Sequence, residues 1–387
     1  MIPHSLRGFF FLQNGPGATG MTSPLDGRGH VTCVDLETRR VTEVRVPASD
    51  HVVTLDDIMK RPWRVVLNSM LFGQRVHGGT CNTAVIPYRG RWHAVEEASF
   101  AYALRFDGSG IGRGHFSRTK LPAHSAPGVR SFHYLASARR YPLTINGMPV
   151  MGWSPPQHER PFVVHSCGRV DNLLVFPIMS TRFGNYDAWL DGSGGLPLHS
   201  ANSSGWLVYD QQTGDTAEVM TEKPTDVFHV AAVRREGDAR LAIFANHVSG
   251  FLEFAQNESS PLHFSFQKHV VDLEAREVVA IEEYPDAAGD FPNTVDSNRD
   301  LVLLNRMGPD SRSEIVLFDL ASERVVDTVT LPHKTGDVLS RDGVHLVYAT
   351  TDQVVVYDRL QRRVHSSYPI PPRARNFHAA LLRAPAA

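Results

Sequence analysis

Four histidines that are far apart along the chain have the type and setting to do chemistry together. His124, His165, His229 and His378 each lie at or beside the end of a strand-like apolar run. An uncharged imidazole binds Fe, Zn, Cu or Ni, so converging rings would form a metal site without cysteine. Residues this distant meet only in a closed, radial fold, in which each repeated unit sends one ring to a shared axis.

The competing interpretation is that these histidines are ordinary core or rim residues. The chain contains 19 histidines, so four similar settings are easy to find. Six other histidines have comparable settings: His93, His133, His199, His247, His263 and His333. The residue types alone therefore leave both interpretations open.

A recurring hairpin pattern points to the fold that would position the rings. An alternating apolar run ends in Asp, a short polar turn follows, and a second alternating run begins. An Asp at the start of a turn can bind the backbone two residues on. Asp272, Asp319 and Asp358 are 47 and 39 residues apart, which matches a four-stranded propeller blade. The copies occupy residues 30–47, 206–220, 269–281, 314–332 and 353–371.

This pattern predicts an all-β fold, a single β-propeller over residues 1–387 with six or seven blades. The apolar patch Phe9–Leu12 is predicted as the first buried strand, because it is too short for a signal-peptide core. Residues 49–63 and 61–73 are the helix candidates, and Pro62 should interrupt any continuous helix through both. The Gly- and Ser-rich residues 180–204 are expected to form a long loop over one face.

Bulk composition excludes several classes of protein. The chain is 42% hydrophobic and 21% charged, which supports a core of normal size. A net charge of −2 gives no electrostatic basis for nucleic-acid binding. Three cysteines without a CxxC motif argue against a disulfide framework and favour a cytoplasmic location. No run reaches the roughly 18 apolar residues of a membrane span, although residues 61–73 are a candidate peripheral membrane contact. No obligate protein partner is evident.

Short motifs spread over most of the chain occur in the same order as in one known family. QNGPGA (13–18) resembles that family's RNGPNP, and DFPNTVDS (290–297) resembles its EFPRIDPR. Three histidines lie in further matching segments: VVHSCGRVDNLLVFPIM (163–179), VFHVAAVRREGD (227–238) and PIPPRARNFHAALL (369–382). By these motifs the chain resembles the carotenoid cleavage oxygenase family, whose members cleave carotenoids, apocarotenoids and stilbenes.

The resemblance implies a seven-bladed β-propeller whose loop elaborations cap one face over an axial Fe(II) site. His124, His165, His229 and His378 would be the ligands and the catalytic residues. His133 is the rival of His124. We prefer His124 because SFHY (131–134) falls where the family has a strand.

The resemblance also implies carboxylates that accept the other ring N–H of three ligands, which fixes the tautomer and the ring orientation. Glu97 matches the first of them, with Glu96 as the neighbouring alternative. Asp290 and Asp337 stand where the family has glutamate, and each is one methylene shorter. Either the backbone moves in or a water bridges the gap, and ordinary turn chemistry is the competing interpretation for both aspartates.

The implied activity is that of a non-haem iron dioxygenase that uses O2 to cleave a C=C bond of a lipophilic or aromatic alkene, giving two carbonyl products. Two alternatives stay open. The same metal site would oxygenate or isomerise a biosynthetic intermediate without cleavage, or the propeller would be a non-catalytic binding module. An apolar substrate path is expected to use aromatic side chains from loops near the ligands: Phe100, Phe132, Tyr134, Trp153, Trp189 and Phe377.

Overall fold

The computed structural model divides the chain into two compact units, each described by itself. The terminal unit comprises Met1–Ala123 with Phe291–Ala387, and the middle unit comprises His124–Asp290. The single-domain organisation over residues 1–387 stays a prediction. The helix candidates 49–63 and 61–73 lie outside the described residues. These are residues 2–15, 29–46, 81–95, 100–121, 124, 132–134, 143–145, 148–149, 165–183, 198–221, 223–256, 262–307, 312–372 and 378–385.

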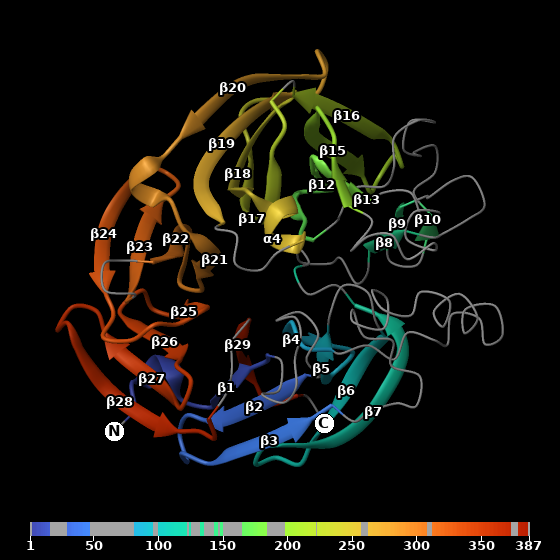
Figure 1. Ribbon diagram of the computed structural model, residues 1–387. Coiled ribbons are helices and arrows are strands. Elements are labelled where there is room, and N and C mark those ends of the chain that lie inside the picture. Colours follow the sequence, from blue (N-terminus) through green and yellow to red (C-terminus); the bar gives the residue numbers. More distant parts are fainter. Residues whose placement is uncertain are drawn as a thin grey trace. The chain divides into compact units, whose positions relative to one another are not determined.

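Four antiparallel four-stranded sheets make up the described part of the terminal unit (Figure 1). One sheet contains β4 (Ala84–Tyr88), β5 (Arg91–Val95), β6 (Phe100–Phe106) and β7 (Ile111–Lys120). The second contains β21 (Asp290–Val295), β22 (Asn298–Met307), β23 (Ser313–Asp319) and β24 (Arg324–Thr330). The third contains β25 (Val338–Ser340), β26 (His345–Ala349), β27 (Gln353–Asp358) and β28 (Arg363–Pro369).

The fourth sheet joins the two ends of the sequence. Its strand order is β29 (Ala379–Arg383), β1 (Phe9–Gln13), β2 (His30–Asp35) and β3 (Val41–Arg45), and η1 (His4–Leu6) precedes it. Figure 1 shows red β29 beside blue β1. The register pairs Gln13 of β1 with Ala379, the first residue of β29. This pairing places His378, the residue before β29, at the end of β1. The first strand predicted at residues 9–12 is confirmed as β1.

Two four-stranded sheets form most of the middle unit. They are β11 (Gly168–Val170), β12 (Leu173–Ile178), β15 (Ser204–Asp210) and β16 (Thr216–Thr221), and then β17 (Asp226–Arg235), β18 (Arg240–Ser249), β19 (His263–Asp272) and β20 (Glu277–Glu283). A shorter sheet contains β8 (Phe132–Tyr134), β9 (Leu143–Ile145) and β10 (Met148–Pro149). The described helices of this unit are α4 (Phe251–Gln256) and η3 (Pro285–Ala287), and no described helix of the chain is long and apolar enough to cross a membrane.

The prediction of one long loop over residues 180–204 was wrong at both of its ends. β13 (Thr181–Phe183) pairs with β14 (Leu198–Ser200), with Thr181 opposite Ser200. The buried Asp226 carboxylate holds this hairpin, because it accepts hydrogen bonds from the Thr181 N–H at 2.8 Å and the Ser180 hydroxyl at 3.0 Å. The long-range partner that makes strands of these residues is not visible in the local sequence.

The five Asp-led hairpins are confirmed, and their turns share one geometry. Asp272 Oδ1 accepts hydrogen bonds from the backbone N–H groups of Glu274 at 3.1 Å and Ala275 at 2.9 Å. The fourth residue after each Asp has a positive φ, between 50° and 81°. Only one of these positions is glycine; the five are Arg39, Gly214, Arg276, Glu323 and Arg362. A residue with a Cβ is strained in this left-handed region.

Apolar cores lie between successive sheets within each unit. In the middle unit, Val175, Trp206 and Ile243 belong to one buried cluster that joins the sheets of β12 and β18. In the terminal unit, Leu303 and Val355 belong to the cluster that joins the sheets of β22 and β27. Sheets that are covered on both faces explain why inner strands such as β12 are apolar at every position.

A buried group of polar rings is shared by two sheets, with His247 in β18, His269 in β19 and Trp206 in β15. The His247 and His269 rings stack with centroids 4.5 Å apart, and the Trp206 Nε1–H donates to His269 Nδ1 at 3.1 Å. Burial lowers the pKa of His269 to about 4, and it lowers the pKa of the nearly fully buried His247 well below its usual value. The Lys223 charge acts in the same direction on both. Both rings are therefore neutral in the folded protein at pH 7.

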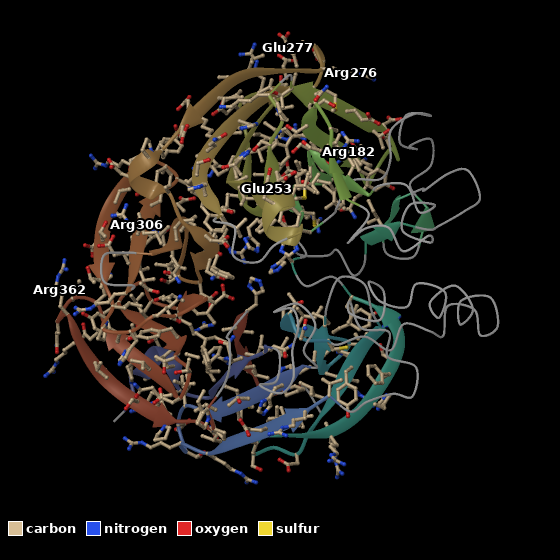
Figure 2. The ribbon with its side chains drawn as sticks, in the orientation of Figure 1. Arg182, Glu253, Arg276, Glu277, Arg306 and Arg362 are labelled. Carbon is tan, nitrogen blue, oxygen red and sulfur yellow. The ribbon has the colours of Figure 1, made fainter. Side chains whose placement is uncertain are left out.

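The strained turn residue Arg276 should tolerate glycine better than its neighbour in β20 does. Figure 2 labels Arg276 and Glu277 at this hairpin. Arg276→Gly removes a left-handed penalty of about 1–2 kcal/mol and adds about 0.4–1 kcal/mol of unfolded-state entropy, so the free energy of unfolding should rise by roughly 0.5 kcal/mol. Glu277→Gly, the matched control in an exposed strand position, should lower it by roughly 0.5–1 kcal/mol. Urea unfolding midpoints measure both changes. An equal loss of unfolding free energy in the two variants would contradict the proposed strain at Arg276.

The neutral His247–His269 pair should make the fold sensitive to acid. Because the folded pKa values are lowered, the unfolded chain binds protons that the folded chain does not. Stability is then complete above about pH 6.5 and falls as the pH drops towards about 4, by up to about 1.4 kcal/mol per pH unit for each ring. Urea unfolding at pH 7, 6 and 5 measures this slope. The double variant His247→Gln/His269→Gln should flatten it, whereas His263→Gln, at an exposed position of β19, should keep it. An unchanged slope in the double variant would refute this origin.

Candidate metal centre

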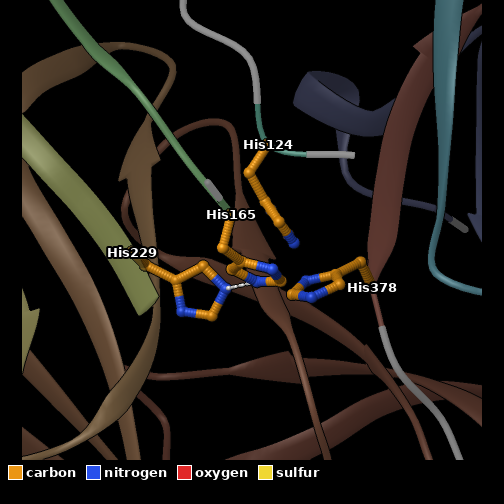
Figure 3. Close-up of side chains that lie close together, drawn as sticks. All are labelled: His124, His165, His229 and His378. Atoms are coloured by element: carbon orange, nitrogen blue, oxygen red, sulfur yellow. Dashed lines mark hydrogen bonds between the residues drawn. The ribbon is translucent and has the colours of Figure 1, made fainter. Parts of the chain in front are cut away.

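Three histidines of the middle unit lie together with their rings facing one another (Figure 3). The ring centroids of His124 lie 4.5 Å from His165 and 4.7 Å from His229, and those of His165 and His229 are 5.1 Å apart. The two Nε2 atoms of His165 and His229 are separated by 3.3 Å. One ring nitrogen of each histidine lies within 4.8 Å of those of the other two. The structure thus brings together residues that are more than 100 positions apart.

The residues that follow His165 connect the three backbones. His124 forms an isolated parallel bridge with Ser166, and the Cys167 N–H donates to the His124 carbonyl at 3.3 Å. The buried Ser166 hydroxyl accepts a hydrogen bond from the Val230 N–H at 3.1 Å. A Cβ on Gly168 would lie 2.7 Å from a Val230 side-chain carbon, so glycine is required for this close approach. The run HSCG therefore aligns the strand of His165 with the other two histidines.

His229 is directed inward by a bulge and held by a carboxylate. The register of β17 against β18 shifts between Val227 and His229, which changes the face on which His229 lies. Its Nδ1 lies 2.8 Å from Asp290 Oδ1, and both side chains are buried. A carboxylate that accepts the Nδ1–H leaves Nε2 unprotonated. The lone pair of His229 is therefore on the atom that faces His165.

His378, in the terminal unit, has the same arrangement with a second aspartate. It precedes β29, and its carbonyl accepts a hydrogen bond from the Asn14 N–H at 3.1 Å. His378 Nδ1 lies 3.1 Å from Asp337 Oδ2, and Asp337 is buried. The same carboxylate accepts from the Ala379 N–H at 2.8 Å and, through Oδ1, from Asn293 Nδ2 at 3.1 Å. Asp337 is thus fixed by three donors, and the His378 Nε2 is left available for a metal.

The chemistry of these donors fits a divalent transition metal. Two nitrogens that each bind one ion at about 2.1 Å, at a right angle, lie roughly 3 Å apart. The His165 and His229 Nε2 atoms have this separation, and the Asp290 bond leaves a lone pair on at least one of them. Neutral imidazoles suit Fe, Zn, Cu and Ni, and the carboxylates would take the second ring nitrogen. The residues present therefore fit a bound iron.

The two aspartates reach their histidines directly. A bridging water, one of the alternatives open from the sequence, does not fit here, because separations of 2.8 Å and 3.1 Å are those of direct hydrogen bonds. Glu97 and its alternative Glu96 lie outside the described residues, as do Trp153, Trp189 and Phe377. Phe100 lies in β6, and Phe132, His133 and Tyr134 lie in β8, but their side chains are outside the described part.

Sequence reasoning missed several residues that hold the site. Ser166 binds the backbone beside His229, and Asn293 binds the carboxylate of Asp337. Asn246 and Asn305 bind the carbonyls that precede Asp290 and Asp337. A signal exists for two of them, because Asn246 and Asn305 are single amides inside apolar strands, in AIFANHV and LVLLNRM. An amide at a buried or half-buried position of such a strand needs a hydrogen-bond partner, which indicates a specific role.

The aromatic residue Phe228 is the described apolar contact of the His165 ring, with centroids 5.5 Å apart. Phe251, at the start of α4, packs on Phe228 at 4.8 Å. These rings give the three histidines an apolar neighbour in the middle unit.

Comparisons with known proteins agree with this architecture. The family described as retinal pigment epithelial membrane protein (RPE65) matches residues 1–299. The structure of an apocarotenoid oxygenase from Synechocystis is similar at 14% identity and a TM-score of 0.70, covering 99% of this chain and 94% of that one. A lignostilbene dioxygenase from Pseudomonas brassicacearum is similar at 16% identity and a TM-score of 0.69, covering 99% and 93%. A comparison with curated protein sequences found no match.

The structural matches extend over nearly the whole chain and confirm the predicted fold class. Six four-stranded sheets and one three-stranded sheet among the described residues correspond to the seven blades of an all-β propeller. The family match spans more than half of the 387 residues. The chain therefore belongs to the RPE65 family, that of the carotenoid cleavage oxygenases.

Proposed function

We propose that this protein is a non-haem Fe(II) dioxygenase that cleaves a C=C bond of a lipophilic or aromatic alkene with O2. The observation that carries the proposal is the group of three facing imidazoles in which the Nδ1–H of His229 is taken by Asp290. The names of two similar structures, an apocarotenoid oxygenase and a lignostilbene dioxygenase, support this reaction class. A cobalt-substituted form of the first, with a TM-score of 0.68, supports a metal-dependent site.

His378 is proposed as the fourth ligand, with His124, His165 and His229. It lies in PIPPRARNFHAALL (369–382), the last of the histidine-containing segments that resemble the family's motifs. Its ring is oriented in the same way as that of His229, with Nδ1 beside a buried aspartate and Nε2 left for the metal. No carboxylate is among the proposed ligands, so the centre keeps the full positive charge of the ion.

The division of work between ion and protein follows from the ligand set. Iron(II), when bound, supplies the site at which O2 becomes reactive towards an electron-rich alkene. The reaction balances without a further reductant, because one alkene and one O2 give two carbonyl products, each with one oxygen atom. The protein then needs no acid or base. Asp290 and Asp337 hold protons on the outer ring nitrogens, and the surrounding residues orient the substrate and exclude water.

The apolar neighbours of the site support an apolar substrate. Phe228 and Phe251 supply an apolar contact beside His165. The proposed path along Phe100, Phe132, Tyr134, Trp153, Trp189 and Phe377 stays a prediction, as do a cytoplasmic location and a peripheral membrane contact through residues 61–73, which lie outside the described residues.

Loss of a ligand should abolish iron retention. His229→Ala and His378→Ala should each leave the protein without stoichiometric iron after anaerobic reconstitution, because each removes one of four donors. Asp290→Ala should weaken iron binding by about 10–100-fold, because the ring loses its orientation. His263→Ala is the matched control at an exposed position of β19 and should bind a full equivalent. Elemental analysis measures the iron, and full occupancy in His378→Ala would show that another residue ligates.

The reaction type is tested by product mass under 18O2. A hydroxystilbene and an apocarotenal are the probes, incubated with the iron-loaded protein, and the products are trapped at once by borohydride to prevent oxygen exchange. Cleavage predicts two fragments, each with one labelled oxygen. A single product of intact carbon skeleton would show non-cleaving oxygenation or isomerisation instead. No turnover of either probe by protein with full iron content would favour a non-catalytic binding module.

A further inference from the structure

The two aspartates that hold candidate ligands share a backbone device. Each follows a glycine, in Gly289–Asp290 and in Gly336–Asp337, and the carbonyl of that glycine accepts a hydrogen bond from an asparagine amide. Asn246 Nδ2 donates to the Gly289 carbonyl in the middle unit. In the terminal unit, Asn305 Nδ2 donates to the Gly336 carbonyl at 2.6 Å and to the Thr335 carbonyl at 2.9 Å.

Neither asparagine is explained by packing. Asn246 is fully buried in β18, directly opposite His229 in the register of β17. Within the described part of the chain, the Oδ1 atoms of both Asn246 and Asn305 are buried without a hydrogen-bond partner. An amide that leaves its own oxygen unpaired destabilises an apolar strand, so its Nδ2 contact must serve another purpose.

The short side chain of aspartate explains why the backbone in front of it must be held. Its carboxyl carbon is only two bonds from Cα, so any displacement of the backbone is passed directly to the carboxylate oxygens. Yet Asp290 lies at 2.8 Å from His229 Nδ1 and Asp337 at 3.1 Å from His378 Nδ1. Phe291, the residue after Asp290, has a φ of 52°, which is strained for a bulky side chain and persists only where the surroundings hold it. The backbone after Asp290 is therefore held in place by its surroundings.

We propose that Asn246 and Asn305 are positioning residues that clamp the peptide in front of Asp290 and Asp337, and thereby fix the tautomer and orientation of His229 and His378. The inference rests on the proposed metal centre. Each clamp acts within one unit and through one carboxylate. Removing a clamp lets the backbone relax away from the ring, and a side chain longer by one methylene is what would reach the ring again.

Asn14 provides an internal comparison from the same fold. Its Nδ2 donates to the carbonyls of Cys81 at 2.8 Å and Ala84 at 2.9 Å, and it is buried as Asn246 is. No aspartate that binds a ring follows those two carbonyls. The Asn14 amide thus makes the same kind of contact without holding an aspartate. The effect of replacing Asn14 should therefore not be repaired by lengthening Asp337.

The test measures Co(II) affinity by competition with a chelator under anaerobic conditions. Asn305→Leu keeps the volume of the side chain and should weaken Co(II) binding about 10-fold, with a changed visible spectrum. Asp337→Glu alone should also weaken binding, because the longer side chain does not fit the clamped, buried position. The double variant Asn305→Leu/Asp337→Glu should recover most of the wild-type affinity. Asn246→Leu with Asp290→Glu repeats the cycle independently and carries the test if an Asn305 variant does not fold.

The controls separate a positioning role from a structural one. Asn14→Leu should lower the thermal midpoint, and Asp337→Glu should not restore any Co(II) affinity that it loses. Wild-type affinity in both Asn246→Leu and Asn305→Leu, or equal recovery in the Asn14 background, would overturn the inference. Absence of Co(II) binding by the wild type would overturn the proposed function instead. In that case the imidazole Nδ1–H signals of 15N-histidine-labelled protein test the clamps without metal, and unchanged signals in both clamp variants would reject them.

Discussion

The proposed metal site depends on two contacts between an aspartate and a histidine, one of them buried and the other half-buried. An imidazole binds a metal through only one nitrogen at a time, and the hydrogen bond at the other nitrogen decides which one is available. Asp290 and Asp337 take the Nδ1–H of His229 and His378, which leaves Nε2 for a metal. A freely tautomerising ring would present the wrong atom part of the time, so the proposed use of His229 and His378 as ligands depends on these two carboxylates.

The strands of the fold position the residues of those contacts, which come from distant parts of the sequence. His229 lies at a bulge of β17, and His378 precedes the strand β29 that pairs with β1. Ser166 and Gly168 allow the backbone of His165 to approach β17. Cross-strand hydrogen bonds fix each of these positions far more firmly than a loop would. The same rigidity would suit the proposed O2 chemistry, in which the protein orients the substrate and supplies no proton of its own.

The repeated hairpins could be predicted from the sequence, whereas the hydrogen bonds between residues far apart in the chain could not. The Asp-led hairpins were predictable, because Asp272 and its equivalents act on residues two and three positions away. The left-handed turn residue was not, since four of its five positions lack glycine. The histidines were found by their settings and by family motifs, whereas Asn246 and Asn305 act on residues 43 and 31 positions away, a separation at which no local pattern applies. The hairpin around Thr181 was missed for the same reason, because Asp226 holds it from 45 positions away.

The most direct test of this account is X-ray diffraction from anaerobic crystals of the iron-loaded protein, with data collected on both sides of the iron absorption edge. We expect one anomalous peak bound by the Nε2 atoms of His124, His165, His229 and His378, with Asp290 on His229 Nδ1 and Asp337 on His378 Nδ1. An iron bound by an aspartate oxygen or through a Nδ1 atom, or rings that share no peak, would contradict it.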